Sequence, residues 1–515
     1  MAWLLLAVQV WIAHESEKVR PDAAPPAAAA APRIHLAAAG GECVGAQVVV
    51  RGPAPELRVA TLASVASLAS VARVATMVLE HPSGPEGATG EWPDPLIPAR
   101  DALFGEARRA FPVDVAAGRS QAVLVEACLP RGTRGRIAGA IRVQWRGGSL
   151  DVPIEVRARG FDLPATPALA TAFGFSGWSA ARGHHRPPEA NLELTRAYDR
   201  MALRRGITLM GGTQAPPDFR VEGESVAIDW RSYDDEVAPF LDGIDGARWT
   251  SVELREPGKL DRAQRRSYRR QWVEHFRQRG WLDRLYRYVV DEPAEKDFAD
   301  VESKAREYLE DVPEVARLVT TMPNPIMRSV NRFTPTVNFF TRGASTWWYQ
   351  ACMTHGCAPS DSAEFRGWPS YMIDAPATAS RAMGALAFAN GIVGELYYDT
   401  VYAYDIGDPW KSQWAFGGNG DGTLYYPGTP DRIGGEHDVP VESLRIVQIS
   451  RGIADYGYLA LCAQLGDPAL AREEALAVAP SLRGYSRDPR AYDRMREHLA
   501  ARIETLLRER KVGSR

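Results

Sequence analysis

The alternation of short apolar segments with longer helical segments, which begins near residue 169, constrains the fold more than any other feature. Eight strand-like segments follow one another along the chain: Thr171–Phe175, Ile207–Met210, Trp249–Leu254, Leu285–Val290, Ala316–Thr321, Thr336–Phe340, Thr346–Ala351 and Val393–Tyr398. Segments of helical character lie between many of them or follow the last: Glu189–Arg205, Arg262–Gln278, Ala294–Asp311, Ala377–Asn390, Val441–Gln464 and Arg490–Arg510. This rhythm is typical of a (β/α)8 TIM-type barrel. The sixth and seventh strands are too close for a regular helix between them, so the strand count is a hypothesis.

The region before this alternation has the pattern of an all-β sandwich. Its strand-like segments are separated by Gly, Pro and Arg turns and include Ala46–Val50, Gln121–Glu126, Gly139–Trp145 and Leu150–Val156. The period of Thr61–Thr76 fits a helix and a strand equally well. The Pro-containing segment Gly160–Ala168 marks a domain boundary. We therefore expect an α/β chain with a β-sandwich over residues 1–160 and a (β/α)8 barrel with C-terminal helices over residues 169–515.

Charge and hydropathy exclude several classes of protein. The chain has 61 Lys and Arg against 64 Asp and Glu, so its surface is not basic throughout, as that of many nucleic-acid-binding proteins is. The segment Arg262–Gln278 is locally basic, but its apolar residues fall near one helical face, which favours a solvated basic face over a nucleic-acid surface. The sequence has no apolar run of about 18 residues or more, so we expect no membrane span.

The cysteines and the N-terminus leave the cellular compartment open. The five cysteines are an odd, sparse set and do not indicate a disulfide framework. Cys352 and Cys357 could form one local bridge, but free thiols are the preferred interpretation. Met1–Ala13 is apolar like the core of a signal peptide, yet it lacks a basic start and a clear Ala-x-Ala cleavage site. Val8–Ile12 also fits a first strand, so the sequence is compatible with a secreted, a periplasmic or a cytoplasmic protein.

The sharpest local signal is an apolar strand that runs into two adjacent carboxylates. The segment Leu285–Pro293 reads LYRYVVDEP, which places Asp291 and Glu292 at the end of the fourth predicted strand. That end of a barrel carries the active site in characterised barrel enzymes. Two neighbouring carboxylates repel each other, so one tends to hold a proton and suits a general acid. The alternative is structural, because Asp-Glu-Pro is also a good helix start.

Aromatic and polar side chains at the ends of later strands converge on the same edge. We expect them to bind a flat, hydroxylated ligand such as a sugar, since aromatic rings combine a large apolar face with polar edges. Core packing is the alternative for the Trp pair, and an ordinary turn is the alternative for residues 419–422. The candidate binding residues are Trp347, Trp348, Tyr349, Tyr397, Tyr398, Asp399, Asn419 and Asp421.

Motifs for several other chemistries are absent from the sequence. It contains no G-x-S-x-G, no Walker A, no H-E-x-x-H and no G-x-G-x-x-G before a helix, which lowers the odds of a serine esterase, a P-loop hydrolase, a zinc protease and a dinucleotide enzyme. The calcium spacing of an EF-hand is absent around Asp421. We therefore expect neither a metal nor a cofactor.

Several motifs in order resemble glycoside hydrolase family 123. They are Tyr286–Pro293, Thr346–Tyr349 (TWWY), Ser370–Arg381, Gly394–Tyr398 (GELYY), Asp408–Trp410, Gly418–Pro427 and Ser443–Tyr458, with Gly41–Gly52 as the best match in the N-terminal region. Their order and approximate spacing match over roughly residues 170–465, whereas Tyr398 stands where the wider group often carries a Trp. The resemblance implies a β-sandwich followed by a catalytic barrel.

The resemblance also implies an activity, that of a retaining β-N-acetylgalactosaminidase that works by substrate assistance. In such a reaction the 2-acetamido oxygen of the sugar attacks the anomeric carbon and forms an oxazolinium ion, outside the usual two-carboxylate scheme. If the roles known in this family apply to the matching residues, Asp291 would orient the acetamido group, and Glu292 would act as acid and then as base. Trp347, Trp348 and Tyr349 would wall the sugar pocket. The implied partner is a glycan, and the sequence does not indicate the oligomeric state.

Two other functions remain open at this point. A glycosidase for a sugar without an acetamido group would need a second carboxylate as nucleophile, for which Asp399 and Glu253 are candidates. A glycan-binding protein on a decayed barrel would keep the aromatic residues but place the carboxylates out of reach. The sugar identity rests on resemblance, because a fold alone does not define a function.

Overall fold

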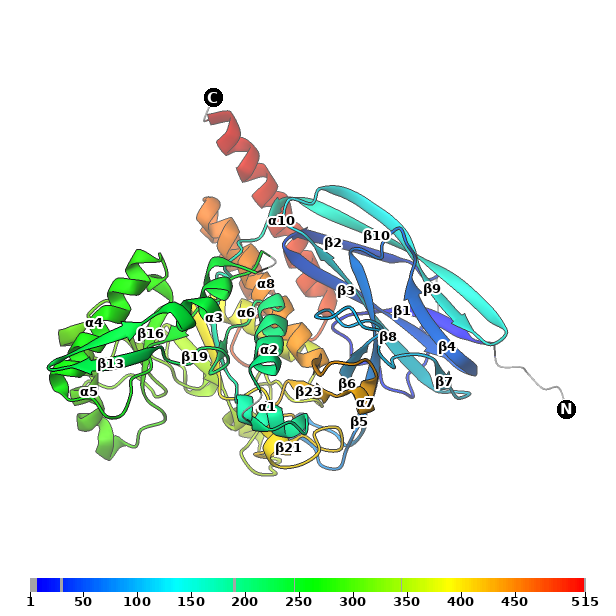
Figure 1. Cartoon of the computed structure of the whole chain (residues 1–515). Helices are drawn as coiled ribbons and strands as arrows, with labels where there is room; N and C mark the ends of the chain where they lie inside the picture. The colour runs from blue at the N-terminus through cyan, green and yellow to red at the C-terminus, as the bar shows by residue number, and fades with distance from the viewer. Residues whose placement is uncertain (1–6, 28–30, 189–190, 245, 344, 514–515) are drawn as a thin grey trace.

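The N-terminal part of the computed structural model consists of two packed five-stranded sheets (Figure 1). The structure describes residues 7–27, 31–188, 191–244, 246–343 and 345–513. One sheet has the order β1-β3-β8-β5-β6, with strands Gln9–His14, Glu42–Arg51, Ser120–Leu129, Ala69–Leu79 and Gly90–Pro98. The other has the order β2-β10-β9-β4-β7, with strands Ile34–Gly40, Gly148–Asp162, Gly135–Trp145, Ala54–Thr61 and Val113–Val115. Alternate Val, Ile and Leu residues of both sheets form one buried core between them.

Two predictions for this part are refined by the structure. Thr61–Thr76, which fitted a helix and a strand equally well, contains the end of β4, a turn and the first residues of β5. Residues 9–14 of the apolar N-terminal segment form strand β1, which pairs with β3 and buries Trp11 and Ala13; residues 1–6 of that segment lie outside the described residues. Strand β10 continues to Asp162, and the domain division between residues 160 and 169 stays a prediction.

Eight short parallel strands follow and form two four-stranded sheets. The first has the order β12-β11-β20-β19, with strands Leu209–Met210, Ala170–Gly174, Gly394–Tyr397 and Trp347–Gln350. The second has the order β15-β16-β17-β18, with strands Val252–Glu253, Leu285–Val290, Ala316–Val319 and Arg332–Phe333. The fold is thus mixed α/β, but within the described residues the expected barrel is two sheets rather than one continuous eight-stranded sheet.

The edges of these two sheets meet at two places. At one, Thr336 forms a single parallel bridge with Tyr349, and the Tyr349 amide donates to the Pro335 carbonyl at 3.0 Å. At the other, the Thr250 amide donates to the Thr208 hydroxyl at 2.8 Å. The predicted strand Thr336–Phe340 is wrong: residues 337–339 form a 3-10 turn, and the strand lies earlier, at β18. Pro335 explains the shift, because proline has no amide hydrogen to continue the ladder.

Helices cover the two parallel sheets and contact the N-terminal sheets. They are α1 (Gly177–Gly183), α2 (Leu192–Arg204), α3 (Arg231–Asp242), α4 (Arg262–Gln278), α5 (Phe298–Asp311), α6 (Ala377–Asn390), α7 (Pro430–Ile433), α8 (Leu444–Leu465), α9 (Pro468–Val478) and α10 (Pro489–Gly513). Three antiparallel pairs complete the fold: β13 (Asp218–Glu222) with β14 (Ser225–Asp229), β21 (Trp414–Ala415) with β22 (Gly418–Asn419), and β23 (Tyr425–Gly428) with β24 (Val439–Glu442). None of the described helices is both long enough and apolar enough to span a bilayer.

The basic helix α4 begins at a capping box formed by Asp261 and Gln264. Its apolar side chains lie in a buried cluster, in agreement with the predicted apolar face. Arg262, Arg266 and Arg269 all contact the buried carboxylate of Asp311 on α5. Much of the positive charge on this helix is therefore neutralised within the protein.

Helix α8 joins the two parts of the molecule, as it lies between them in Figure 1. Leu444 and Val447 pack into a buried cluster with residues of β1, β3 and β8. The guanidinium of Arg451 contacts Glu126 on β8 at 2.6 Å, and both side chains are buried. Apolar packing and buried ion pairs thus fix the N-terminal sheets against the parallel sheets.

Four of the five cysteines are paired, which corrects the preference for free thiols. Cys43 on β3 is bonded to Cys128 on β8, and Cys352 is bonded to Cys357 in the loop after β19. Cys462 on α8 is a buried free thiol. Cys43 and Cys128 are 85 residues apart, so no local pattern indicates this pair, whereas strand register places them directly opposite each other.

Candidate active site

Asp291 and Glu292 lie at the carboxyl end of β16, where the sequence predicted them. The strand ends at Val290, and both carboxylate side chains are exposed. Glu292 has a φ of 38°, in the left-handed region that a residue with a Cβ rarely adopts. This turn breaks the strand alternation, so both adjacent carboxylates stand at the same strand end. Strained backbone of this kind often occurs at functional sites.

Three hydrogen bonds with Tyr288 and Thr320 position the two acidic residues. The Tyr288 hydroxyl donates to Asp291 Oδ1 at 2.6 Å, and the Thr320 hydroxyl donates to the same oxygen at 2.8 Å. The Thr320 hydroxyl also accepts from the Glu292 amide at 2.7 Å. Thr320 is 3% exposed and follows β17, the strand next to β16. One buried hydroxyl therefore contacts both members of the pair.

Tyr349 reaches the pair from the other parallel sheet. Its hydroxyl donates to Glu292 Oε1, and the two residues are 57 positions apart in sequence. Burial and the neighbouring carboxylate raise the pKa of Tyr349 far above its usual value, so the hydroxyl keeps its proton and stays a donor. Burial and the charge of Asp291 raise the pKa of Tyr288 in the same way.

The structure separates the three aromatic residues of the TWWY motif. Trp347 and Tyr349 face inward, where Trp347 packs with Tyr286 beneath the mouth. Trp348 faces the opposite side of the sheet, is 0% exposed and packs against Phe340 in the core under the helices. Its predicted contact with a ligand is therefore not supported, because successive residues of a strand point to opposite faces. Trp347 is 2% exposed and supports the floor of the site.

Tyr397, Tyr398 and Asp421 form a second group at the carboxyl end of β20. The Tyr397 hydroxyl accepts from the Gly422 amide at 2.8 Å and lies 3.4 Å from Asp421 Oδ1. His355, from the loop closed by the Cys352–Cys357 bridge, has Nε2 at 3.5 Å from Asp421 Oδ2. The sequence analysis did not select His355, whose only sequence signal is its place in a cysteine-flanked loop.

Burial controls the titration of this second group. It raises the pKa of Asp421 to about 7 and lowers the pKa of His355 to about 4. Asp421 Oδ2, both ring nitrogens of His355 and the Tyr398 hydroxyl are buried and have no hydrogen-bond partner among the described residues. Buried water or a substrate hydroxyl would satisfy them, since buried polar groups rarely stay unpaired.

The two remaining candidates have structural contacts. Asp399 accepts from the Val401 amide at 2.7 Å, and burial raises its pKa to about 7. Asn419 is buried and donates to the His81 carbonyl at 2.8 Å, which ties its loop to the N-terminal part. The structure therefore does not bring Asn419 to the carboxylate pair. Tyr288 and Thr320 contact the pair instead, and the sequence held a signal for Thr320, because it lies near the end of the predicted strand Ala316–Thr321.

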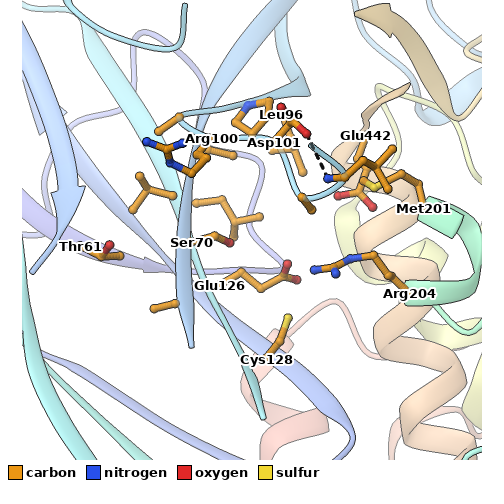
Figure 2. Close-up of a pocket in the computed structure, with 18 of the residues that line it drawn as sticks. Thr61, Ser70, Leu96, Arg100, Asp101, Glu126, Cys128, Met201, Arg204 and Glu442 are labelled. Carbon is orange, nitrogen blue, oxygen red and sulfur yellow. Dashed lines mark hydrogen bonds between the residues drawn. The ribbon is translucent and has the colours of Figure 1, made fainter. Parts of the chain in front are cut away.

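A separate cavity of about 670 Å³ lies between the N-terminal sheets and α2 (Figure 2). Glu126, Met201, Arg204 and Glu442 are among its lining residues, and it contains none of the residues selected from the sequence. Cys43, Glu126 and Cys128 are the group of potential metal ligands found in the part of the chain that the structure describes. Both sulfur atoms are in a disulfide, so this group offers no thiolate to a metal.

No family model matches this chain, and no curated protein matches its sequence. Among solved structures, the chain is similar to a family 123 glycoside hydrolase from Clostridium perfringens, with a TM-score of 0.65 and 10% identity over 99% of this chain and 100% of that one. It also matches a family 5 xyloglucanase from Bacteroides ovatus, with a TM-score of only 0.27 and 12% identity over 82% of this chain and 98% of that one. The first similarity confirms the resemblance to family 123 at the level of the fold.

Proposed function

We propose that the protein is a retaining exo-glycosidase that hydrolyses terminal β-linked 2-acetamido-2-deoxy sugars, most favourably N-acetylgalactosamine. The observation that carries the proposal is the adjacent pair Asp291 and Glu292. Both carboxylates are exposed at one strand end, and each accepts hydrogen bonds from different hydroxyl groups. Asp291 accepts from Tyr288 and Thr320, whereas Glu292 accepts from Tyr349. Separate hydrogen-bond sets suit two carboxylates with separate tasks.

In the proposed mechanism the substrate supplies the nucleophile. The acetamido oxygen attacks the anomeric carbon while the bond from this carbon to the leaving oxygen breaks. Glu292 donates its proton to the leaving oxygen, and Asp291 orients the acetamido group and stabilises the positive charge of the oxazolinium ion. Water then attacks the same carbon, gives a proton to Glu292 and restores the acetamide. The two inversions retain the configuration, which is the known exception to catalysis by two separated carboxylates.

The contacts of the alternative nucleophiles favour this mechanism over a covalent one. Glu253 is buried and pairs with Arg255 at 3.0 Å and with Arg287 at 3.3 Å. Asp399 caps a backbone amide, and its raised pKa makes it partly protonated near neutral pH. An attacking carboxylate needs to be ionised and free to reach the sugar. Neither residue meets both conditions.

The natural substrate and the compartment are part of the same proposal. The similar Clostridium perfringens enzyme is described as acting in glycolipid glycan hydrolysis. For this chain we infer a natural substrate of the same kind, a glycan that ends in a β-linked acetamido sugar. The two disulfides favour a protein that works in an oxidising compartment, because such bonds rarely persist in the cytosol.

Hydrolysis of four aryl β-glycosides tests the proposal. The substrates carry N-acetylgalactosamine, N-acetylglucosamine, galactose or glucose, and the wild type is compared with Glu292→Gln and Asp291→Asn. We expect turnover of the acetamido sugars alone and its loss in both variants, with unchanged circular dichroism. Turnover of plain hexosides would refute substrate assistance. A folded wild type that binds a glycan but cleaves none of the four would favour a glycan-binding protein.

A further inference from the structure

A bulky aromatic residue occupies a turn position that its backbone conformation disfavours. Strands β21 and β22 pair with Ala415 opposite Gly418, so Phe416 and Gly417 form a two-residue hairpin turn. Both have positive φ, 45° for Phe416 and 74° for Gly417. Turns of this kind prefer Asn-Gly or Asp-Gly, because a large side chain at positive φ is strained. Backbone preference therefore does not explain Phe416.

Burial does not explain Phe416 either. Its side chain is 45% exposed, so much of the apolar ring faces solvent. The ring lies 5.1 Å from that of Tyr402 and 6.0 Å from that of Tyr398, measured between centroids. The rings of Tyr398 and Tyr402 are 6.1 Å apart. The three residues come from three segments and form one aromatic group, with Phe416 at its exposed end.

Strand order places this aromatic group on the same edge of the parallel strands as the carboxylate pair. Tyr349, which contacts Glu292, lies opposite Leu396 on the neighbouring strand β20, and both side chains face inward. Tyr398 directly follows β20, so it stands at the carboxyl end of this parallel sheet, next to the end of β19 that carries Tyr349. Gly422 leaves room for it, since a Cβ there would lie 2.4 Å from the Tyr398 hydroxyl.

We propose that Tyr398, Tyr402 and Phe416 form a binding platform for the sugar ring on the leaving-group side of the cleaved bond. This inference rests on the proposed function. An exo-acting site holds the terminal sugar over the carboxylates, so the next ring extends outward past Tyr398 toward Phe416. The apolar C–H face of a pyranose stacks on an exposed aromatic ring, and strain at positions that contradict local preference commonly marks function.

Two substrates that differ only in the leaving group test the platform. One is the methyl β-glycoside of the acetamido sugar, and the other carries the same sugar linked to galactose. In Phe416→Asn, which supplies a residue suited to the turn, we expect kcat/KM for the disaccharide to fall about tenfold. The value for the methyl glycoside should stay within about twofold, and Tm should stay equal or rise. Phe416→Tyr should keep the wild-type ratio between the two substrates.

A matched control is Phe104→Asn, because Phe104 is 48% exposed but lies in the N-terminal part of the chain. It should leave the substrate ratio unchanged. Equal losses on both substrates in Phe416→Asn, or no loss on either, would overturn the platform while the proposed function stands. If the wild type cleaves neither substrate, calorimetric binding of the disaccharide decides: weaker binding by Phe416→Asn than by Phe104→Asn supports the platform, and equal binding or none refutes it.

Discussion

Replacement of Thr320 by valine tests how the carboxylate pair is positioned. Valine has nearly the same shape as threonine, so Thr320→Val removes the hydroxyl without opening a cavity. The change removes the 2.8 Å hydrogen bond to Asp291 and the acceptor of the Glu292 amide at 2.7 Å. It leaves the Tyr288 hydroxyl on Asp291.

These contacts set the expected losses of stability and of kcat in Thr320→Val. A hydrogen bond to a charged group contributes about 1.5–3 kcal/mol, and an unpaired polar group costs about 1–3 kcal/mol when it stays away from water. Glu292 is exposed, so water can accept part of the hydrogen bonding that its amide loses. We therefore expect the free energy of unfolding to fall by about 1–3 kcal/mol. A misplacement of about 1 Å in a catalytic group costs about 100-fold in rate. We therefore expect kcat to fall about 10–100-fold and KM to change less than about threefold.

The assay is steady-state hydrolysis of an aryl β-N-acetylgalactosaminide, with thermal unfolding measured in parallel. Thr320→Ser should retain most of the activity, because it keeps the hydroxyl. The matched control is Thr334→Val at the end of β18, since Thr334 is 0% exposed and has no hydrogen bond to either carboxylate. A kcat for Thr320→Val within threefold of wild type, or an equal loss in Thr320→Ser, would refute the positioning role.

Three further variants test other parts of the structure. Tyr349→Phe removes the donor to Glu292, and we expect a fall of about tenfold in kcat with little change in Tm. Burial raises the pKa of Glu395 to about 7, so the folded protein keeps a proton that the unfolded chain loses above about pH 4.3, and stability falls as pH rises through this window. Denaturant unfolding should show Glu395→Gln gaining about 2–3 kcal/mol relative to wild type between pH 5 and pH 8. Replacement of Cys43 and Cys128 by serine should lower unfolding stability by about 2–5 kcal/mol, because that bridge closes a loop of 85 residues.

Each of these variants has a specific control. Tyr286→Phe removes a hydroxyl that has no hydrogen-bond partner in the described structure and should not change kcat. Glu364→Gln at an exposed position should show no such pH-dependent gain, and a parallel pH profile for Glu395→Gln and wild type would contradict the burial argument. Cys462→Ser removes the free thiol, so a loss as large as that of the double variant would show that the bridge is not the cause.

The carboxylate pair of the candidate site was predictable because it directly follows one strand. The apolar run Leu285–Val290 and the two carboxylates after it are consecutive in sequence, and parallel strands end at a common edge. Helix α4 has the predicted bounds for a similar reason, since apolar periodicity and a capping box define it. Helix α6 also has the predicted bounds, because Pro376 precedes it and Gly391 ends it in the left-handed conformation. The face of Trp348 was not predictable in this way, because alternation alone does not say which face of a strand is inward.

The sequence by itself determined seven of the eight parallel strands, the placement of Asp291 and Glu292 at a strand end, and the resemblance to a glycoside hydrolase family. These follow from residues a few positions apart, whose periodicity and turn chemistry act locally. Only the tertiary structure decided that Thr320 and Tyr349 hold the pair, because they lie 28 and 57 residues from Glu292. It also decided that four cysteines pair and that Phe416 stands in a strained turn. Such contacts depend on strand register and packing, which no local pattern specifies.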